Sequence, residues 1–121
     1  MANTTEEPLL KTHTFEDTLL DCHVIFHVIK MKDSLFLWIG DQGNFDSLAV
    51  AMKTPYSTSP VSSALMGHSA DDYSCSLAAQ LSERIKMQVF ASYNLSRSDS
   101  NFITIIARRL IKEITDNPNK F

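Results

Sequence analysis

The sequence predicts an α+β protein with one antiparallel sheet of about six strands, two helices on one face of that sheet, and a second apolar sheet face through which the chain pairs. The first half is rich in β-branched and aromatic residues that alternate as in strands. The second half holds two segments whose apolar residues recur at helical spacing. We expect a single domain over residues 1–121, with a flexible N-terminal tail over 1–10 and a C-terminal tail from about 117 to 121.

Five segments before residue 67 are expected to be strands. The clearest is 22–31, which is rich in Val, Ile and Phe. A short polar turn separates it from 35–39, so these two segments should form an antiparallel hairpin. The remaining candidates are 12–20, 47–53 and 60–66.

The second half of the chain changes its period. Four apolar residues at four-residue spacing predict a helix, namely Tyr73, Leu77, Leu81 and Ile85. Its N-cap is expected to be Ser69 or Asp71. A strand should follow over 88–94 and a second helix over about 99–115. The β-branched run at 103–106 leaves a strand start as the alternative for that last element.

Composition argues against several classes of function. The chain holds 11 basic and 14 acidic residues, a net charge of −3, whereas nucleic acids and anionic membranes attract basic surfaces. Apolar stretches such as 35–39 are too short to cross a bilayer, and the N-terminus lacks the pattern of a secretory signal. We therefore expect a cytoplasmic protein in which Cys22 and Cys75 are free thiols.

The hairpin over 22–39 is apolar on both of its faces. In the segment 22–31, the even positions hold Val24, Phe26 and Val28, while the odd positions alternate histidine and isoleucine. Two helices cover one sheet face but hardly both, and an apolar face left uncovered usually marks an interaction surface. The candidate interface residues are His23, Ile25, His27, Ile29 and Trp38. The alternative is that the loop at 54–63 or the N-terminal segment folds over this face.

No catalytic, cofactor or metal site emerges from the sequence. His23 and His27 lie about 13 Å apart if their segment is a strand, which is too far to bind one metal ion. The segment 67–70 (Gly-His-Ser-Ala) partly matches a nucleophile elbow but lacks its second glycine. We favour a loop leading to a helix over a serine hydrolase at Ser69, and we expect a binding protein that is not an enzyme.

Several segments resemble the proteasome assembly chaperone 4 family. The most recognisable is 33–40 (Asp-Ser-Leu-Phe-Leu-Trp-Ile-Gly). Further matching segments follow in the same order at 48–52, 60–62, 65–67, 88–95, 99–102 and 120–121. No single segment is specific for this family, but the segments together are, because they follow one another in the same order. The resemblance covers roughly residues 15–121.

This resemblance implies a non-catalytic chaperone of 20S proteasome assembly whose fold is an antiparallel sheet with two helices. Family members pair with proteasome assembly chaperone 3 as a heterodimer, bind proteasome α subunits, α5 in particular, and promote α-ring formation. We also expect a homodimer when the chain is isolated. The end of the sequence, 119–121, lacks the penultimate tyrosine with which other factors dock into α-ring pockets. The alternative function is a small dimeric trafficking adaptor of the longin or roadblock type.

Overall fold

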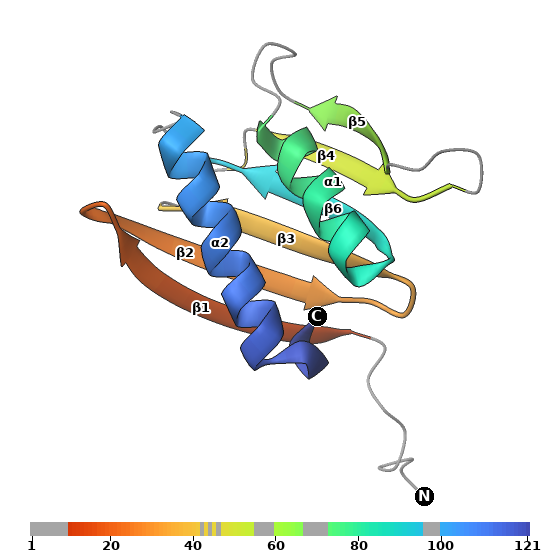
Figure 1. Cartoon of the computed structure of the whole chain (residues 1–121), viewed down its shortest axis with the longest axis horizontal. Coiled ribbons are helices and arrows are strands. Elements are labelled where there is room, and N and C mark those ends of the chain that lie inside the picture. Colours follow the sequence, from red (N-terminus) through yellow and green to blue (C-terminus); the bar gives the residue numbers. More distant parts are fainter. Residues whose placement is uncertain are drawn as a thin grey trace, which may run out of the picture.

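A computed structural model describes residues 10–41, 43, 45, 47–54, 60–66, 73–95 and 100–121. It shows one six-stranded sheet with two long helices on the same face, so the predicted α+β fold is confirmed (Figure 1). The elements are β1 (Lys11–Leu19), β2 (Cys22–Lys30), β3 (Ser34–Gly40), β4 (Leu48–Met52), β5 (Val61–Met66), α1 (Tyr73–Ile85), β6 (Gln88–Tyr93), α2 (Ser100–Asp116) and the short 3₁₀ helix η1 (Pro118–Lys120). The alternative of a strand start within the last helix is wrong.

The strand order is β1-β2-β3-β6-β4-β5. The sheet is mostly antiparallel, as predicted, but β3 and β6 run parallel, so the sheet is mixed. This pair arises because β6 follows the crossover helix α1 and inserts between β3 and β4, which are consecutive in the sequence. Residue patterns predict strands but not their order, so the sequence did not predict the parallel pair.

The first hairpin closes through a two-residue turn. Leu19 and Cys22 are cross-strand partners, and the two residues between them, Leu20 and Asp21, have φ angles of 48° and 65°. Positive φ at both central positions is what a type I′ turn requires, and such turns match the twist of the strands that they join. The turn therefore sets the register of β1 on β2.

The core lies between the sheet and the helices. On β2 the residues facing the helices, Val24, Phe26 and Val28, are at most 1% exposed. They are joined by equally buried residues of β3, α1 and α2, namely Leu35, Leu37, Ile39, Leu77, Phe102, Ile106 and Leu110. The helical stripes predicted from spacing thus face the sheet, and their burial holds both helices on the same side.

The end of the described chain is packed and does not project as a tail. Pro118–Lys120 form η1, and the side chain of Phe121 is 5% exposed within the core. Its ring lies edge-on to His13 of β1, with 6.2 Å between centroids. The C-terminal tail expected from about residue 117 is therefore part of the fold, because a terminal aromatic gains more by burial than by exposure. The expected N-terminal tail lies outside the described residues, apart from Leu10.

Candidate protein-interaction surface

No helix or strand among the described residues covers the side of the sheet opposite the helices (Figure 1). We call this side the open face. Residues paired across neighbouring strands point to the same side, so the register defines its membership. Its members include Thr14, Glu16, His23, Ile25, His27, Ile29, Phe36, Trp38, Phe90, Val50, Met52 and Val61.

All five residues predicted as an interface lie on the open face. Ile25, Ile29 and Trp38 are half-buried in the single chain, and His23 and His27 are exposed. Trp38 is the cross-strand partner of His27, so the structure brings the five together over two neighbouring strands. Their role as an interface remains a prediction. The alternative cover for this face was the loop at 54–63 or the N-terminal segment, of which residues 55–59 and 1–9 lie outside the described residues.

Aromatic residues form the middle of the open face. Phe36 of β3 is paired with Phe90 of β6, and Phe45 stacks on Phe36 with 6.2 Å between ring centroids. The indole of Trp38 lies directly over Gly40, two residues along the same strand. A Cβ at Gly40 would come within 2.5 Å of the indole. Glycine at this position therefore lets the indole lie close against the sheet.

The open face is polar at one edge and aliphatic at the other. At the β1–β2 edge, Thr14 Oγ1 and His27 Nδ1 are 2.9 Å apart, and His23 lies 3.6 Å from the carboxylate of Glu16. At the β4–β5 edge, Met52 and Val61 are cross-strand partners that are 46% and 53% exposed. A surface with an aromatic centre and one polar edge has the composition of protein interfaces.

Beyond Ile25, Ile29 and Trp38, sequence reasoning missed the aromatic and aliphatic residues of this surface. Phe36 alternates with Leu35 and Leu37, and this alternation already placed it on the same side as Trp38. Phe90 and Val50 carried no comparable signal, because only the strand order makes them neighbours of β3. The predicted residues are therefore the part of the surface that lies within one hairpin.

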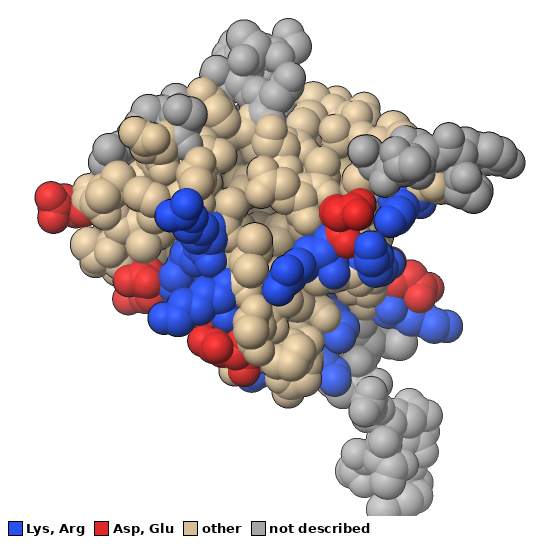
Figure 2. Space-filling view, in the orientation of Figure 1, with Lys and Arg blue, Asp and Glu red and all other residues tan. Residues whose placement is uncertain are grey.

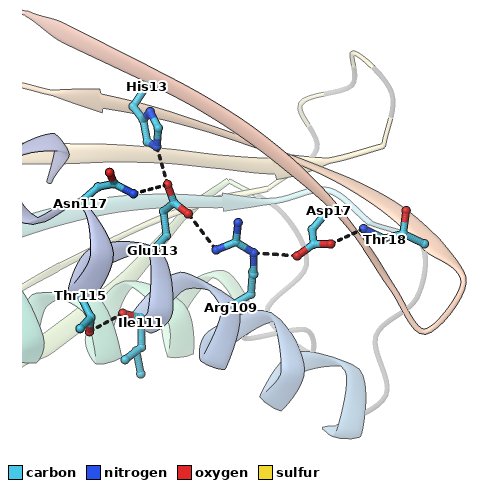
Figure 3. A network of polar contacts seen from close by, with 8 residues as sticks. All are labelled: His13, Asp17, Thr18, Arg109, Ile111, Glu113, Thr115 and Asn117. Carbon is cyan, nitrogen blue, oxygen red and sulfur yellow. Dashed lines mark hydrogen bonds and ion pairs between the residues drawn. The ribbon is translucent and has the colours of Figure 1, made fainter.

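The opposite, helix-covered side holds a partly buried polar network that joins β1 to α2 (Figure 3). Glu113 of α2, which is 8% exposed, accepts hydrogen bonds from His13 Nε2 at 2.8 Å and from Arg109 at 2.9 Å. Asn117 donates to the same carboxylate at 2.9 Å. Arg109 also donates to Asp17 at 2.8 Å. On α2, Glu113 is thus bonded to His13 of β1, and Arg109 to Asp17 of β1.

The charges of this network shift the pKa values of its members. Burial by itself would raise the pKa of Glu113, but the hydrogen bonds from His13 and Arg109 and the positive charge nearby outweigh it and lower that pKa. Burial would likewise lower the pKa of Arg109, but its contacts with Glu113 and Asp17 raise it. The guanidinium also lies over the ring of Phe15, 4.9 Å from its centroid. These contacts stabilise the ionised pair and identify the network as structural.

A second polar cluster lies near the ends of β4 and β6. Ser47 and Ser74 are joined through their hydroxyls at 2.7 Å, and Ser74 accepts from the backbone N–H of Tyr93 at 3.0 Å. Asn94 donates to the hydroxyl of Ser92 at 2.8 Å. The cluster satisfies buried backbone and hydroxyl groups and contains no base that could activate a serine. The hydrolase alternative at Ser69 lies outside the described residues.

Other kinds of site find no support in the part of the chain that is described. Within it, no group of three or more His, Cys, Asp or Glu side chains could hold a metal ion. Neither described helix is long and apolar enough to span a membrane. Cys22 and Cys75, which are both described, are not joined by a disulfide.

These features define a class: a small α+β protein built on one sheet, with an apolar sheet face of the kind that marks a protein-interaction site. A family model described as proteasome assembly chaperone 4 matches residues 23–95. Human and mouse proteins named Proteasome assembly chaperone 4 are each 42% identical to this chain over 109 residues, which cover 90% of this chain and 89% of theirs. The chain belongs to the proteasome assembly chaperone 4 family.

A solved structure shares the fold. It is a chain from the crystal structure of a chaperone complex for yeast 20S proteasome assembly, with a TM-score of 0.67. The match covers 93% of this chain and 97% of the yeast chain at 15% sequence identity. The family match favours the assembly chaperone hypothesis over the trafficking adaptor.

Proposed function

We propose that this protein is a chaperone for 20S proteasome assembly that acts through binding alone, as one half of a dimer with proteasome assembly chaperone 3. The observation that carries the proposal is the 42% identity to human proteasome assembly chaperone 4 over nearly the whole chain. The open face supplies the physical basis for pairing. The activity belongs in the cytoplasm, a reducing compartment in which Cys22 and Cys75 are expected to form no disulfide.

Pairing through the open face would remove apolar side chains from water. Ile25, Ile29, Phe36, Trp38 and Phe90 keep part of their apolar surface in water when the chain is alone. A stable protein interface buries about 1,200–2,000 Å² in total, and buried aromatic residues near its centre supply much of the affinity. A second sheet laid on the open face would bury these residues and leave the helices of both chains on the outside.

The chaperone role follows from binding energy alone. The dimer would hold an α subunit, α5 in particular, in the geometry that its neighbours in the α ring require. Later subunits would displace the dimer sterically before the particle is finished. No covalent step is needed.

The test is mass spectrometry of proteins that co-purify with the tagged chain from a cytosolic extract. We expect proteasome assembly chaperone 3 and α subunits with the natural sequence. Trp38→Ala should lose the partner chaperone while its folded state persists, because Trp38 is only half-buried in the single chain.

Lys32→Ala, in an exposed turn off the open face, is the matched control and should retain every partner. Recovery of GTPases or coat proteins without proteasome subunits would refute the proposal and favour the trafficking adaptor. If Trp38→Ala retains the partner chaperone as well as the control does, pairing does not use the centre of the open face.

A further inference from the structure

The helix-covered side of the molecule has a candidate binding surface of its own, between α1 and α2. A shallow hollow lies between α1 and α2 and opens to solvent. Figure 2, which looks onto this side, shows the hollow with Lys and Arg side chains on either side of it. Its lining is largely apolar and comprises Leu77, Gln80, Leu81, Ala107, Leu110 and Ile111. We call it the helix groove.

The size of the helix groove indicates what kind of group it can accept. The hollow has room for about one water-sized group, far less than the about 300–1,000 Å³ that pockets for small-molecule ligands enclose. A large side chain cannot insert, because Leu77, Leu81 and Leu110 of the lining are at most 2% exposed. A partner can instead lay an apolar side along the hollow, as an amphipathic helix does in a groove of its partner. The two flanking helices offer ridges against which a third helix could pack.

The charge around the helix groove is positive, although the whole chain carries a net charge of −3. Arg108 and Lys112 lie one turn apart on the exposed side of α2, and neither forms an ion pair with another described residue. From α1, Arg84 reaches across to Thr115 of α2, with 3.5 Å between its Nη2 and the hydroxyl.

The acidic residues nearby do not cancel this charge. Glu83 of α1 is already contacted by two lysines, Lys53 at 3.6 Å and Lys86 at 3.7 Å. Glu113 is turned inward and bonded to Arg109. Asp116 alone adds a negative charge at the exposed end of α2. An approaching segment therefore meets a predominantly basic surface, which attracts acidic partners.

We propose that the helix groove binds an acidic amphipathic helix of a partner protein, laid with its apolar side along the groove between α1 and α2. Ala107 and Ile111 contact the apolar side of that helix, and Arg84, Arg108 and Lys112 recognise its acidic flank. The helix groove and the open face lie on opposite sides of the sheet (Figure 1). Both surfaces can then be occupied at once, so the chain can bind this helix while paired with a dimer partner. The inference stands on the groove and does not depend on the proposed function.

The test is a binding titration on the full chain. The probe is a synthetic helical peptide with leucines at positions i, i+3, i+4 and i+7 and glutamates elsewhere, and the comparison peptide carries lysines in place of the glutamates. We expect the acidic peptide to shift the amide NMR signals of α1 and α2, and to bind at least about tenfold more tightly than the basic one. Added salt should weaken the binding.

The double variant Arg84→Glu, Arg108→Glu should lose about tenfold or more in affinity for the acidic peptide. Lys11→Glu with Lys32→Glu makes the same charge change away from the helix groove and should bind normally apart from a small long-range effect. If the first variant fails to fold, Gln80→Glu with Lys112→Glu replaces it at exposed positions. The proposal is overturned by absence of binding, by equal affinity for both peptides, or by shifts confined to the open face.

Discussion

Trp38 can lie flat on the open face because Gly40 has no side chain. The two residues occupy successive positions on the same side of β3, and the indole covers the buried backbone of Gly40. Trp38 also has His27 beside it on β2, with 5.4 Å between ring centroids. A single missing Cβ thus sets the height of the largest side chain on the proposed interface.

Gly40→Ala should therefore displace the indole of Trp38. The added Cβ would meet the indole at 2.5 Å, a distance that forces a movement. We expect a loss of about 1–3 kcal/mol in the free energy of unfolding, which is typical of overpacking. Trp38 is the only tryptophan, so its fluorescence spectrum reports the displacement directly.

Gly43→Ala provides the matched control for this substitution. A Cβ at Gly43 would have no heavy atom within 4 Å, so both the spectrum and the stability should stay close to those of the natural chain. An unchanged spectrum in Gly40→Ala would show that the indole does not rest on Gly40.

Between elements, the network around Glu113 attaches the edge strand β1 to α2. The pKa of Glu113 is lowered from its ordinary value of 4.5. A lowered pKa means that the folded chain binds fewer protons than the unfolded chain between the two pKa values. The ionised carboxylate therefore stabilises the fold fully above about pH 4.5, and this contribution is lost as the pH falls through the folded-state value.

Glu113→Gln should lower the free energy of unfolding by about 1–3 kcal/mol at neutral pH, because it removes charged hydrogen bonds to His13 and Arg109. Urea denaturation at a series of pH values checks this. The difference between natural chain and variant should shrink as the pH falls below about 4.5.

Asp116→Asn serves as the control for the loss of a carboxylate on α2. Asp116 is exposed at the end of the helix, so its replacement should change stability by only a few tenths of a kcal/mol. A difference for Glu113→Gln that stays constant with pH would mean that ionised Glu113 is not stabilised by its partners.

The two sides of β2 should respond in opposite ways to a buried charge. Ile29→Glu places a carboxylate on the open face, next to Thr12 and Phe36, and should leave the chain folded but unable to pair. We choose Ile29 over Ile25 because Ile25 lies opposite Glu16, where a second carboxylate would add repulsion within the chain.

Phe26→Glu is the comparison on the helix-covered side. Phe26 is 0% exposed and stacks on Phe15 at 4.6 Å between ring centroids. An unpaired carboxylate there should cost several kcal/mol and unfold the chain. Circular dichroism and sedimentation separate the two outcomes. A folded Phe26→Glu that cannot pair, beside an unfolded Ile29→Glu, would reverse the assignment of faces.

At the scale of the whole molecule, the open face should make the isolated chain self-associate. Half-buried aromatic and aliphatic residues extend over β2, β3, β6 and β4, and a patch of this kind rarely stays in water. Light scattering over the micromolar range should show a homodimer that Ile29→Glu converts to a monomer. A strict monomer of the natural chain would count against pairing through the open face.

The extent of sequence-based prediction differs between local and non-local features. All six strands and both helices were predicted from residue patterns, because alternation and helical spacing are properties of neighbouring residues. The packing of residues 117–121 was not predicted, because Phe121 is a lone apolar residue and forms no repeating pattern with its neighbours. The polar network was missed for a similar reason: His13 and Glu113 are distant in sequence and meet only through the fold.

The sequence by itself determined the fold class, the family and the two-sided apolar character of β2 and β3. It did so because these depend on which residues alternate within short segments, and on segments that match a family in order. Only the tertiary structure decided the strand order, the parallel pairing of β6 with β3 and the full extent of the open face. It also created the helix groove, whose walls come from two helices separated by β6. These features depend on long-range packing, which brings together segments whose local residue patterns do not indicate that they will be neighbours.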